Sequence, residues 1–173
     1  MKSNKLRIIP IGKIEQSILE DVVKAMKRTF KIPVEIGETF ELPEESFNRF
    51  RNQYISDVIL EDLEKKFTDR VLAVTDVDIY TDKLNFIFGQ AKMGGNVSIV
   101  SLFRLDPAFY KQPHDEKLLK ERLIKECIHE FGHLLGLRHC REIGCVMNFS
   151  NNIREVDNKT DKFCHMCQIQ LNI

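Results

Sequence analysis

The sequence lacks net charge, a long apolar run and any sign of a targeting segment. Its 26 basic residues balance its 26 acidic residues, so no excess charge favours binding to nucleic acid or to an anionic membrane surface. No apolar run approaches the roughly 20 residues of a membrane-spanning helix. The run 8–11 is also too short for the core of a signal peptide. We therefore expect a cytoplasmic protein, a monomer, that binds neither nucleic acid nor membrane.

Internal repeats and low-complexity segments are also missing. The 173 residues, 43% of them hydrophobic, fit one compact domain with a proper core. We expect residues 1–173 to form a single domain. Within it, an αβ upper subdomain over 1–136 and a small, loop-rich lower subdomain over 137–173 would enclose a cleft.

The segment from His129 to His139 has the pattern of a zinc site. His129 and His133 are four residues apart, so on a helix their rings share one face, with Cβ atoms roughly 5–6 Å apart. Glu130 lies one position further around the helix, which suits contact with a metal-held water better than a ligand role. Gly136 can end the helix in the left-handed conformation, and the chain can then return His139 to the same ion. Three neutral imidazoles leave one tetrahedral position for water, as in a catalytic zinc site.

A helix with incidental histidines is the alternative to a metal site. At about 100° per residue, His129 and His133 fall together on one side of the helix. The other side is a broad apolar half formed by Leu119, Leu123, Ile124, Cys127, Ile128, Phe131, Leu134 and Leu135. One face is suited to packing and the other to metal binding, which favours the zinc site.

Four of the five cysteines form a second candidate metal site. Their spacing, C-x4-C followed by C-x2-C, favours a closed structural zinc, and paired cysteines in a cytosolic protein are more often metal ligands than disulfides. A competing assignment places His139 or His165 in this site instead of one cysteine. The fifth, Cys127, is expected to be an inert buried thiol. The four candidate ligands are Cys140, Cys145, Cys164 and Cys167.

Hydrophobic patterns predict alternating strands and helices before the histidine motif. Strands are expected over 6–11, 32–36 and 71–74, and helices over 14–26 and from Pro43 to Leu63. A strand, a helix and a strand in this order form a right-handed crossover with parallel strands. Asp115 is a plausible N-cap for the helix that carries the motif.

Residues 85–91 and 96–103 predict a hairpin, because Gly94-Gly95 between them suits a turn. One of its strands must run against the parallel strands. An exposed sheet edge can bind an extended peptide as an added strand. Gly89, with Gly94-Gly95, either lets a substrate backbone approach closely or only serves the turn.

Together these residues resemble the archaemetzincins, a branch of the metzincin zinc peptidases. The resemblance covers most of the chain, is strongest from Val71 to Cys167, and includes segments 51–54, 74–78, 85–89 and 101–105. It implies an α/β (α+β) fold with a five-stranded, mixed, twisted sheet. The first hairpin strand would be its antiparallel edge, beside a backing helix, an active-site helix and a zinc-stapled C-terminal subdomain. The implied roles are zinc ligands at His129, His133 and His139, a general base at Glu130, a Met-turn at Met147 and a structural zinc on the four cysteines.

The expected function is that of a zinc-dependent metallopeptidase acting on peptides or proteins, with two Zn²⁺ per chain, one catalytic and one structural. Glu130 would take a proton from a zinc-activated water. No tyrosine follows Met147, so the metal, with edge-strand amides, must stabilise the oxyanion. The alternative is a two-zinc binding or scaffold protein with an occluded site, in which Glu130 would have no role. Asp76 and Asp78 lack the further ligands of a calcium loop, which favours a structural role for both.

Overall fold

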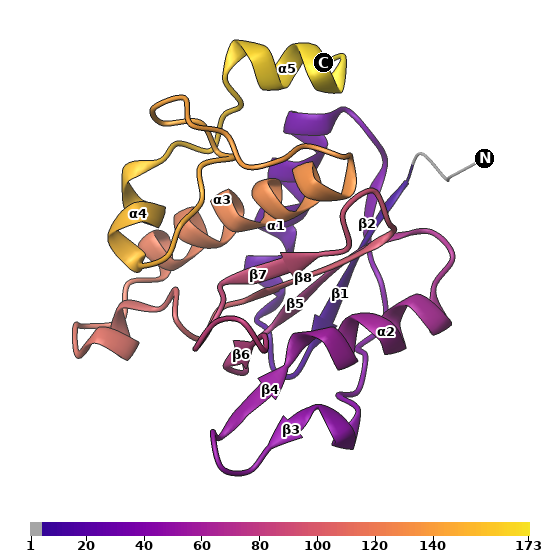
Figure 1. Ribbon diagram of the computed structural model, residues 1–173, viewed down its shortest axis with the longest axis vertical. Coiled ribbons are helices and arrows are strands. Elements are labelled where there is room, and N and C mark those ends of the chain that lie inside the picture. The colour runs from indigo at the N-terminus through magenta and orange to yellow at the C-terminus, as the bar shows by residue number, and fades with distance from the viewer. Residues whose placement is uncertain (1–4) are drawn as a thin grey trace.

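A five-stranded sheet forms the centre of the computed structural model, which describes residues 5–173 (Figure 1). Its order is β2-β1-β5-β8-β7. The first four strands are parallel, and β7 runs antiparallel to β8 at the edge, with Gly89 opposite Val100. The predicted mixed sheet with one antiparallel edge strand is therefore confirmed. The strands are β1 (Leu6–Ile11), β2 (Val34–Ile36), β5 (Arg70–Thr75), β7 (Gly89–Ala91) and β8 (Val97–Ser101).

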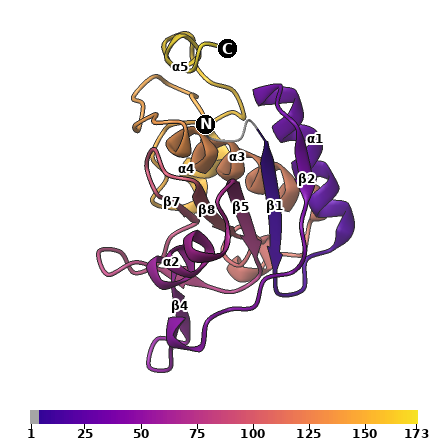
Figure 2. The same cartoon turned by 90° about the vertical axis from the view of Figure 1, so that its right-hand side faces the viewer.

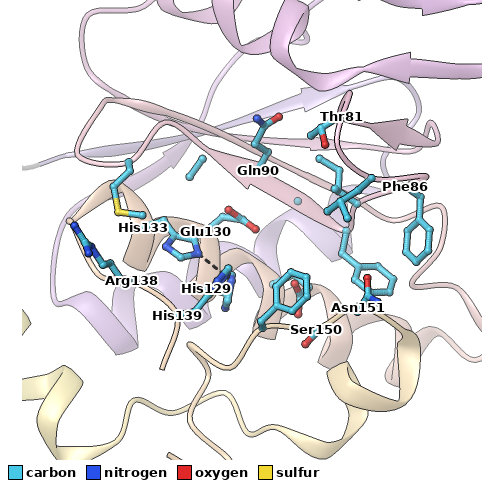
Figure 3. A pocket seen from close by; sticks show the side chains of 18 residues that line it. Thr81, Phe86, Gln90, His129, Glu130, His133, Arg138, His139, Ser150 and Asn151 are labelled. Atoms are coloured by element: carbon cyan, nitrogen blue, oxygen red, sulfur yellow. Dashed lines mark hydrogen bonds between the residues drawn. The ribbon is translucent and has the colours of Figure 1, made fainter. Parts of the chain in front are cut away.

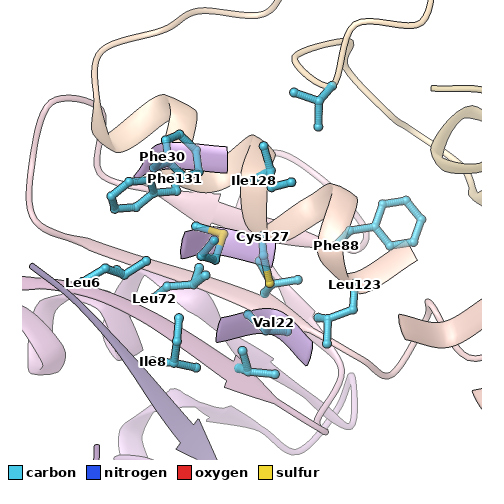
Figure 4. Close-up of a cluster of buried hydrophobic side chains, with 14 of the residues drawn as sticks. Leu6, Ile8, Val22, Phe30, Leu72, Phe88, Leu123, Cys127, Ile128 and Phe131 are labelled. Carbon is cyan, nitrogen blue, oxygen red and sulfur yellow. The ribbon is translucent and has the colours of Figure 1, made fainter. Parts of the chain in front are cut away.

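Helices cover both faces of this sheet (Figures 1 and 2). Helices α1 (Gln16–Phe30) and α3 (Glu116–Leu134) pack on one face, and α2 (Ser56–Lys66) packs on the other. Strands β1 and β5 are consequently almost fully buried and read as nearly continuous apolar runs, as expected for parallel strands between two helical layers. The larger core lies under α1 and α3, where Cys127 and Phe131 face Leu6 and Leu72 (Figure 4).

Helix α3, which carries the histidine motif, has the predicted ends. The Asp115 side chain accepts a hydrogen bond from Leu118 N at 3.0 Å, satisfying one free donor of the first turn. At the other end Gly136 adopts a left-handed φ of 96°. The backbone N–H of Leu137 then donates back to Gly132 O at 3.0 Å. The chain therefore turns sharply after α3 instead of continuing along its axis.

The predicted helix from Pro43 to Leu63 is wrong in its first half. A short 3₁₀ turn (Glu44–Ser46) leads into β3 (Phe47–Asn48) and β4 (Gln53–Ile55), and only then does α2 begin. The Asn48 side chain accepts from the backbone N–H groups of residues 50 and 51, which favours a turn over a helix. Strand β4 also pairs with β6 (Ile79–Tyr80), a distant segment. Phe50, which lies within the predicted helix, is fully exposed between β3 and β4.

The chain after Gly136 is mostly loop, as predicted, with two short helices. Helix α4 (Ile153–Asn158) packs on α3, and α5 (His165–Leu171) follows the last pair of cysteines. Arg122 of α3 joins the two parts by a bidentate pair with Asp157, both contacts being 2.8 Å. The division into subdomains 1–136 and 137–173 stays a prediction. Over residues 5–173, no helix is both long and apolar enough to cross a membrane.

Candidate active site

Three imidazoles converge at the C-terminal half of α3 (Figure 3). His129 and His133 come from successive turns of the helix, and His139 comes from the loop that returns after Gly136. One ring nitrogen from each lies within 4.8 Å of the other two. The tertiary structure thus brings together the three histidines that the sequence pattern selected, and it leaves His165 out of this group.

Hydrogen bonds fix which nitrogen of each helical histidine points inward. His129 Nδ1 lies 2.8 Å from Val146 O, and His133 Nδ1 lies 2.7 Å from Leu137 O. A carbonyl oxygen only accepts, so each Nδ1 must carry the proton. Both Nε2 atoms are then acceptors in the neutral rings, and they face each other at 3.1 Å. Two facing lone pairs repel unless a cation lies between them, so this donor set fits a metal ion.

The ionisation of the rings agrees with a metal site. Burial holds the pKa of His129 well below its usual value, and burial also lowers the pKa of His133. The pKa of His139 is lowered by partial burial of its ring and by the nearby His133. All three rings therefore favour the neutral form that binds metal. The separation of 3.1 Å between the two Nε2 atoms is close to the about 3.3 Å edge of a tetrahedron with zinc–nitrogen bonds of about 2.0–2.1 Å.

Glu130 lies beside the three rings and against the edge strand. A Cβ built on Gly89 would come within 2.8 Å of Glu130 Cγ and 2.9 Å of its Oε1. The missing side chain at Gly89 therefore makes room for the carboxylate, a reason that the sequence did not suggest. Burial raises the pKa of Glu130 well above its usual range, and the neighbouring Glu126 adds to this rise.

Met147 lies beneath the motif, packed on Gly132. A Cβ on Gly132 would be 2.6 Å from Met147 Sδ, so only glycine admits this close approach. Met147 is fully buried, and its carbonyl accepts from Cys140 N at 2.9 Å. The preceding residue, Val146, provides the carbonyl that orients His129. One buried loop therefore supports both the helical and the returning histidine.

The four predicted cysteines converge in a second group, separate from the histidines. The Sγ atoms of Cys140 and Cys164 are 3.8 Å apart, as are those of Cys145 and Cys167. A disulfide would require about 2.05 Å, whereas zinc–sulfur bonds of about 2.3 Å place tetrahedral sulfurs about 3.8 Å apart. The backbone N–H of Cys164 points at Cys145 Sγ at 3.4 Å, a contact that suits a thiolate. This geometry fits a closed metal site without a histidine.

A cavity of about 540 Å³ opens over the histidines, between β7 and the loop after Met147. Arg138 lies in its wall at the His133 end (Figure 3), and Met93 also lines it. Residues of β7 and of the segment before it, together with aromatic side chains, Ser150 and Glu126, also line the cavity. Glu126 was not selected from the sequence, although it lies one turn before Glu130 and so faces the same side of α3. The lining also includes Phe86, Phe88, Phe149 and Asn151.

A family model described as peptidase family M54 matches residues 12–173. The chain belongs to this family. It is 42% identical to an archaemetzincin of Methanocaldococcus jannaschii, over 94% of this chain and 90% of that protein. It is 41% identical to an archaemetzincin of Pyrococcus furiosus, over 92% and 88% respectively.

Solved structures of this family share the fold. The archaemetzincin of Archaeoglobus fulgidus, complexed with malonate, matches with a TM-score of 0.83 at 34% identity, over 96% of this chain and 99% of that one. A zinc-dependent peptidase from Methanocorpusculum labreanum matches with a TM-score of 0.89 at 30% identity, over 96% and 100%. The archaemetzincin resemblance predicted from the motifs is thus confirmed. The chain is a zinc-dependent peptidase, a hydrolase, and its substrates are peptides or proteins.

The other archaemetzincin-like segments support the roof of the cleft. Asn85 lies next to the cleft residues Leu84 and Phe86, and its carbonyl accepts from Arg51 at 2.9 Å and from Gln53 at 3.0 Å. Gln53 also donates to Asp78, which forms a bidentate pair with Arg104 at 2.8 Å. Polar residues as far apart in the sequence as Arg51 and Arg104 therefore hold one segment in place. The Asn85 carbonyl is bonded to the Arg51 and Gln53 side chains and not to a neighbouring strand. The strand predicted over 85–91 is therefore shorter and covers only β7 (Gly89–Ala91).

The contacts of the other residues considered as candidate ligands indicate structural roles or exposure to solvent. Asp76 accepts from the backbone N–H of Lys13, which agrees with the structural role predicted for it. Cys127 is fully buried in the core, where burial raises the pKa of its thiol well above the usual value. His114, a histidine outside the zinc motif, is exposed and contacts the Asp106 carboxylate.

Proposed function

We propose that His129, His133 and His139 hold the zinc ion of the peptidase and that Glu130 is its general base. The observation that carries the proposal is the pair of inward-facing Nε2 atoms, both acceptors, with Glu130 alongside them in one cavity. Glu130 is not part of the converging ligand group within residues 5–173. Its carboxylate is therefore available for proton transfer.

The surroundings of Glu130 suit that task. Bound zinc would polarise the substrate carbonyl and lower the pKa of the attacking water. Glu130 accepts the proton of this water and passes it to the leaving amine. Burial raises the pKa of Glu130. The carboxylate is therefore a stronger base, and its pKa lies closer to neutral pH. Gly89 keeps the carboxylate between the edge strand and the imidazoles.

The edge strand β7 is the proposed backbone-binding element. It pairs only with β8 within the described chain, so its other edge faces the cleft. An extended substrate can add to such an edge through main-chain hydrogen bonds. No tyrosine lines the cavity among the described residues, so the oxyanion would rely on the metal and on backbone amides.

We also propose that the cysteine group holds a second, structural zinc, giving two ions per chain. Cys140 directly follows His139, and Cys145 precedes Val146, whose carbonyl orients His129. A metal on the cysteines would thus fix the loop that completes the histidine site. Cytoplasmic location and a monomeric state stay predictions.

Two substitutions test the assigned roles. Glu130→Ala should lower peptide hydrolysis by at least about 10²-fold, the usual contribution of a positioned general base, while the zinc content stays unchanged. His133→Ala should lose both the histidine-site metal and the activity. Peptide turnover and metal analysis on the same preparations measure both effects. Near-normal turnover by Glu130→Ala would show that another group is the base.

A hydroxamate separates this proposal from the alternative of an occluded scaffold protein. The alternative is not favoured, because the cavity includes all three histidines and Glu130. A hydroxamate chelates an accessible zinc and should bind and inhibit. Absence of binding to zinc-loaded protein would support the occluded site instead.

A further inference from the structure

We propose that Lys159 and Asn148 are positioning residues of the peptidase, which together with Glu126 hold the loop of His139 against α3. This inference rests on the proposed function of the three histidines as zinc ligands. Neither Lys159 nor Asn148 lines the cavity. Each would therefore act through the loop and not on the substrate.

Lys159 is a cation in the interior of the protein, just after α4. Its side chain is 1% exposed, and its ammonium lies 2.7 Å from Oε1 of Glu126, whose side chain is 4% exposed. The same ammonium donates to the backbone carbonyl of Asn148 at 3.2 Å. An ammonium has three donors, so one side chain can contact both groups. Lys159 therefore connects the helix that carries the histidine motif to the residue after Met147.

Asn148 extends this connection to the residue next to His139. Its side-chain amide donates to Cys140 O at 2.9 Å and to Glu142 O at 2.7 Å. The backbone N–H of Cys140 also donates to Met147 O at 2.9 Å. Both backbone polar groups of Cys140 are thus held by the two residues 147 and 148. Because Cys140 directly follows His139, these bonds limit where the His139 ring can lie.

The His139 ring depends on such support more than the two helical histidines do. The Nδ1 atoms of His129 and His133 each contact a backbone carbonyl, which orients their rings. The His139 ring contacts the Phe149 ring and the other two imidazoles, but among residues 5–173 no hydrogen bond orients it. Its place beside the other two rings is therefore set by the backbone of its loop.

A buried ion pair suits this positioning role better than it suits stabilisation of the fold. The cost of removing two charges from water offsets most of their attraction, and apolar residues of similar volume are often neutral or stabilising in their place. Apolar residues, however, donate no directed hydrogen bond to the loop. Replacing Glu126 and Lys159 together should therefore disturb the loop more than it disturbs the fold.

The test measures the zinc affinity of the histidine site by competition with a chromogenic chelator. Affinity that disappears in a His133→Ala background belongs to this site. The double variant Glu126→Leu with Lys159→Met removes both charges, so neither is left buried without its partner. We expect it to bind zinc about 10–100-fold more weakly, the usual effect of losing a group that supports a metal ligand.

Asn148→Ala is the second test variant. It removes the contacts with the Cys140 and Glu142 carbonyls and leaves the buried charges in place. Zinc should bind about tenfold more weakly. This variant keeps the test decisive if the double variant does not fold.

A matched control removes another ion pair between α3 and α4. Arg122 and Asp157 contact each other twice at 2.8 Å, and neither lines the cavity. Arg122→Met with Asp157→Leu should lower the melting temperature and leave the zinc affinity unchanged. An equal loss of affinity in this control would mean that the affinity follows general loosening, and would overturn the proposal. Wild-type affinity in both test variants would also overturn it.

Peptide turnover at saturating zinc separates this inference from the proposed function. Weaker zinc binding by both test variants, in a protein that cleaves no peptide, would support the positioning role and contradict the proposed catalytic roles. Zinc affinity that His133→Ala leaves unchanged would show that the histidines do not hold the ion, and would overturn both proposals.

Discussion

Gly89→Ala should disable the peptidase while leaving both metals in place. The new Cβ would lie 2.8 Å from Glu130 Cγ and 2.8 Å from Ile99 O. Carbon atoms pack at about 3.5–4.0 Å, so the pair must separate by about 1 Å. The Ile99 carbonyl belongs to β8, an inner strand of the sheet that is paired on both sides, and cannot shift easily, so Glu130 must move.

The expected loss follows from that displacement. A misplacement of about 1 Å can cost about 10²-fold in rate, so kcat should fall by this factor while the zinc content is unchanged. Overpacking at a buried position should also lower the free energy of unfolding by about 1–3 kcal/mol. Steady-state kinetics, metal analysis and thermal unfolding on the same protein measure the three quantities.

Gly94→Asn is the control in the same hairpin. A Cβ on Gly94 meets nothing within 4 Å, and asparagine tolerates its φ of 65° better than most residues. This variant should lose some stability and keep its kcat. If Gly89→Ala retains kcat within threefold, or if both variants lose it equally, the close contact between Gly89 and Glu130 does not position the base.

Three further predictions concern the metals and the loop that supports them. A moderate chelator should remove about one zinc equivalent, ending activity with little change in circular dichroism, because the histidine site faces a cavity; simultaneous loss of two ions would contradict separate sites. Cys164→Ser should lower the melting temperature sharply, since structural zinc contributes on the order of 10 kcal/mol in small peptides, and an unchanged melting temperature would argue against that site. For metal-free protein, the lowered pKa values of His129 and His133 mean that the unfolded state binds more protons, so the free energy of unfolding should fall as pH drops below about 6.5; urea titrations at several pH values measure it.

Several features were predictable because they depend on residues close in sequence. The spacing of His129 and His133, the cap at Asp115 and the turn at Gly136 are all local to one helix, and the structure has each as predicted. The buried strands β1 and β5 are nearly continuous apolar runs, as expected for strands of a parallel sheet that is covered on both faces. The spacing of the paired cysteines likewise predicted a metal site, and the structure brings their four sulfur atoms together.

The hairpin before α2 shows where local pattern fails. Residues from Phe47 to Leu63 have apolar residues at near-helical intervals, yet Gln53–Ile55 pairs with Ile79–Tyr80. The rings of Phe47 in β3 and Tyr54 in β4 contact each other across the hairpin, with 4.9 Å between their centroids. These partners are distant along the chain, or face each other only once the turn exists, so the spacing of apolar residues did not reveal them.

The sequence by itself determined the donor sets, since histidine and cysteine spacing fixes which groups can meet on one helix face or one loop pair. Only the tertiary structure decided what surrounds them. Lys159 lies in a charged loop sequence, yet it is buried against Glu126. Gly89 adjoins Glu130 from forty-one positions away, and Val146 orients His129 across the chain. Such contacts depend on how β7, α3 and the returning loop pack together, and no short-range pattern encodes that packing.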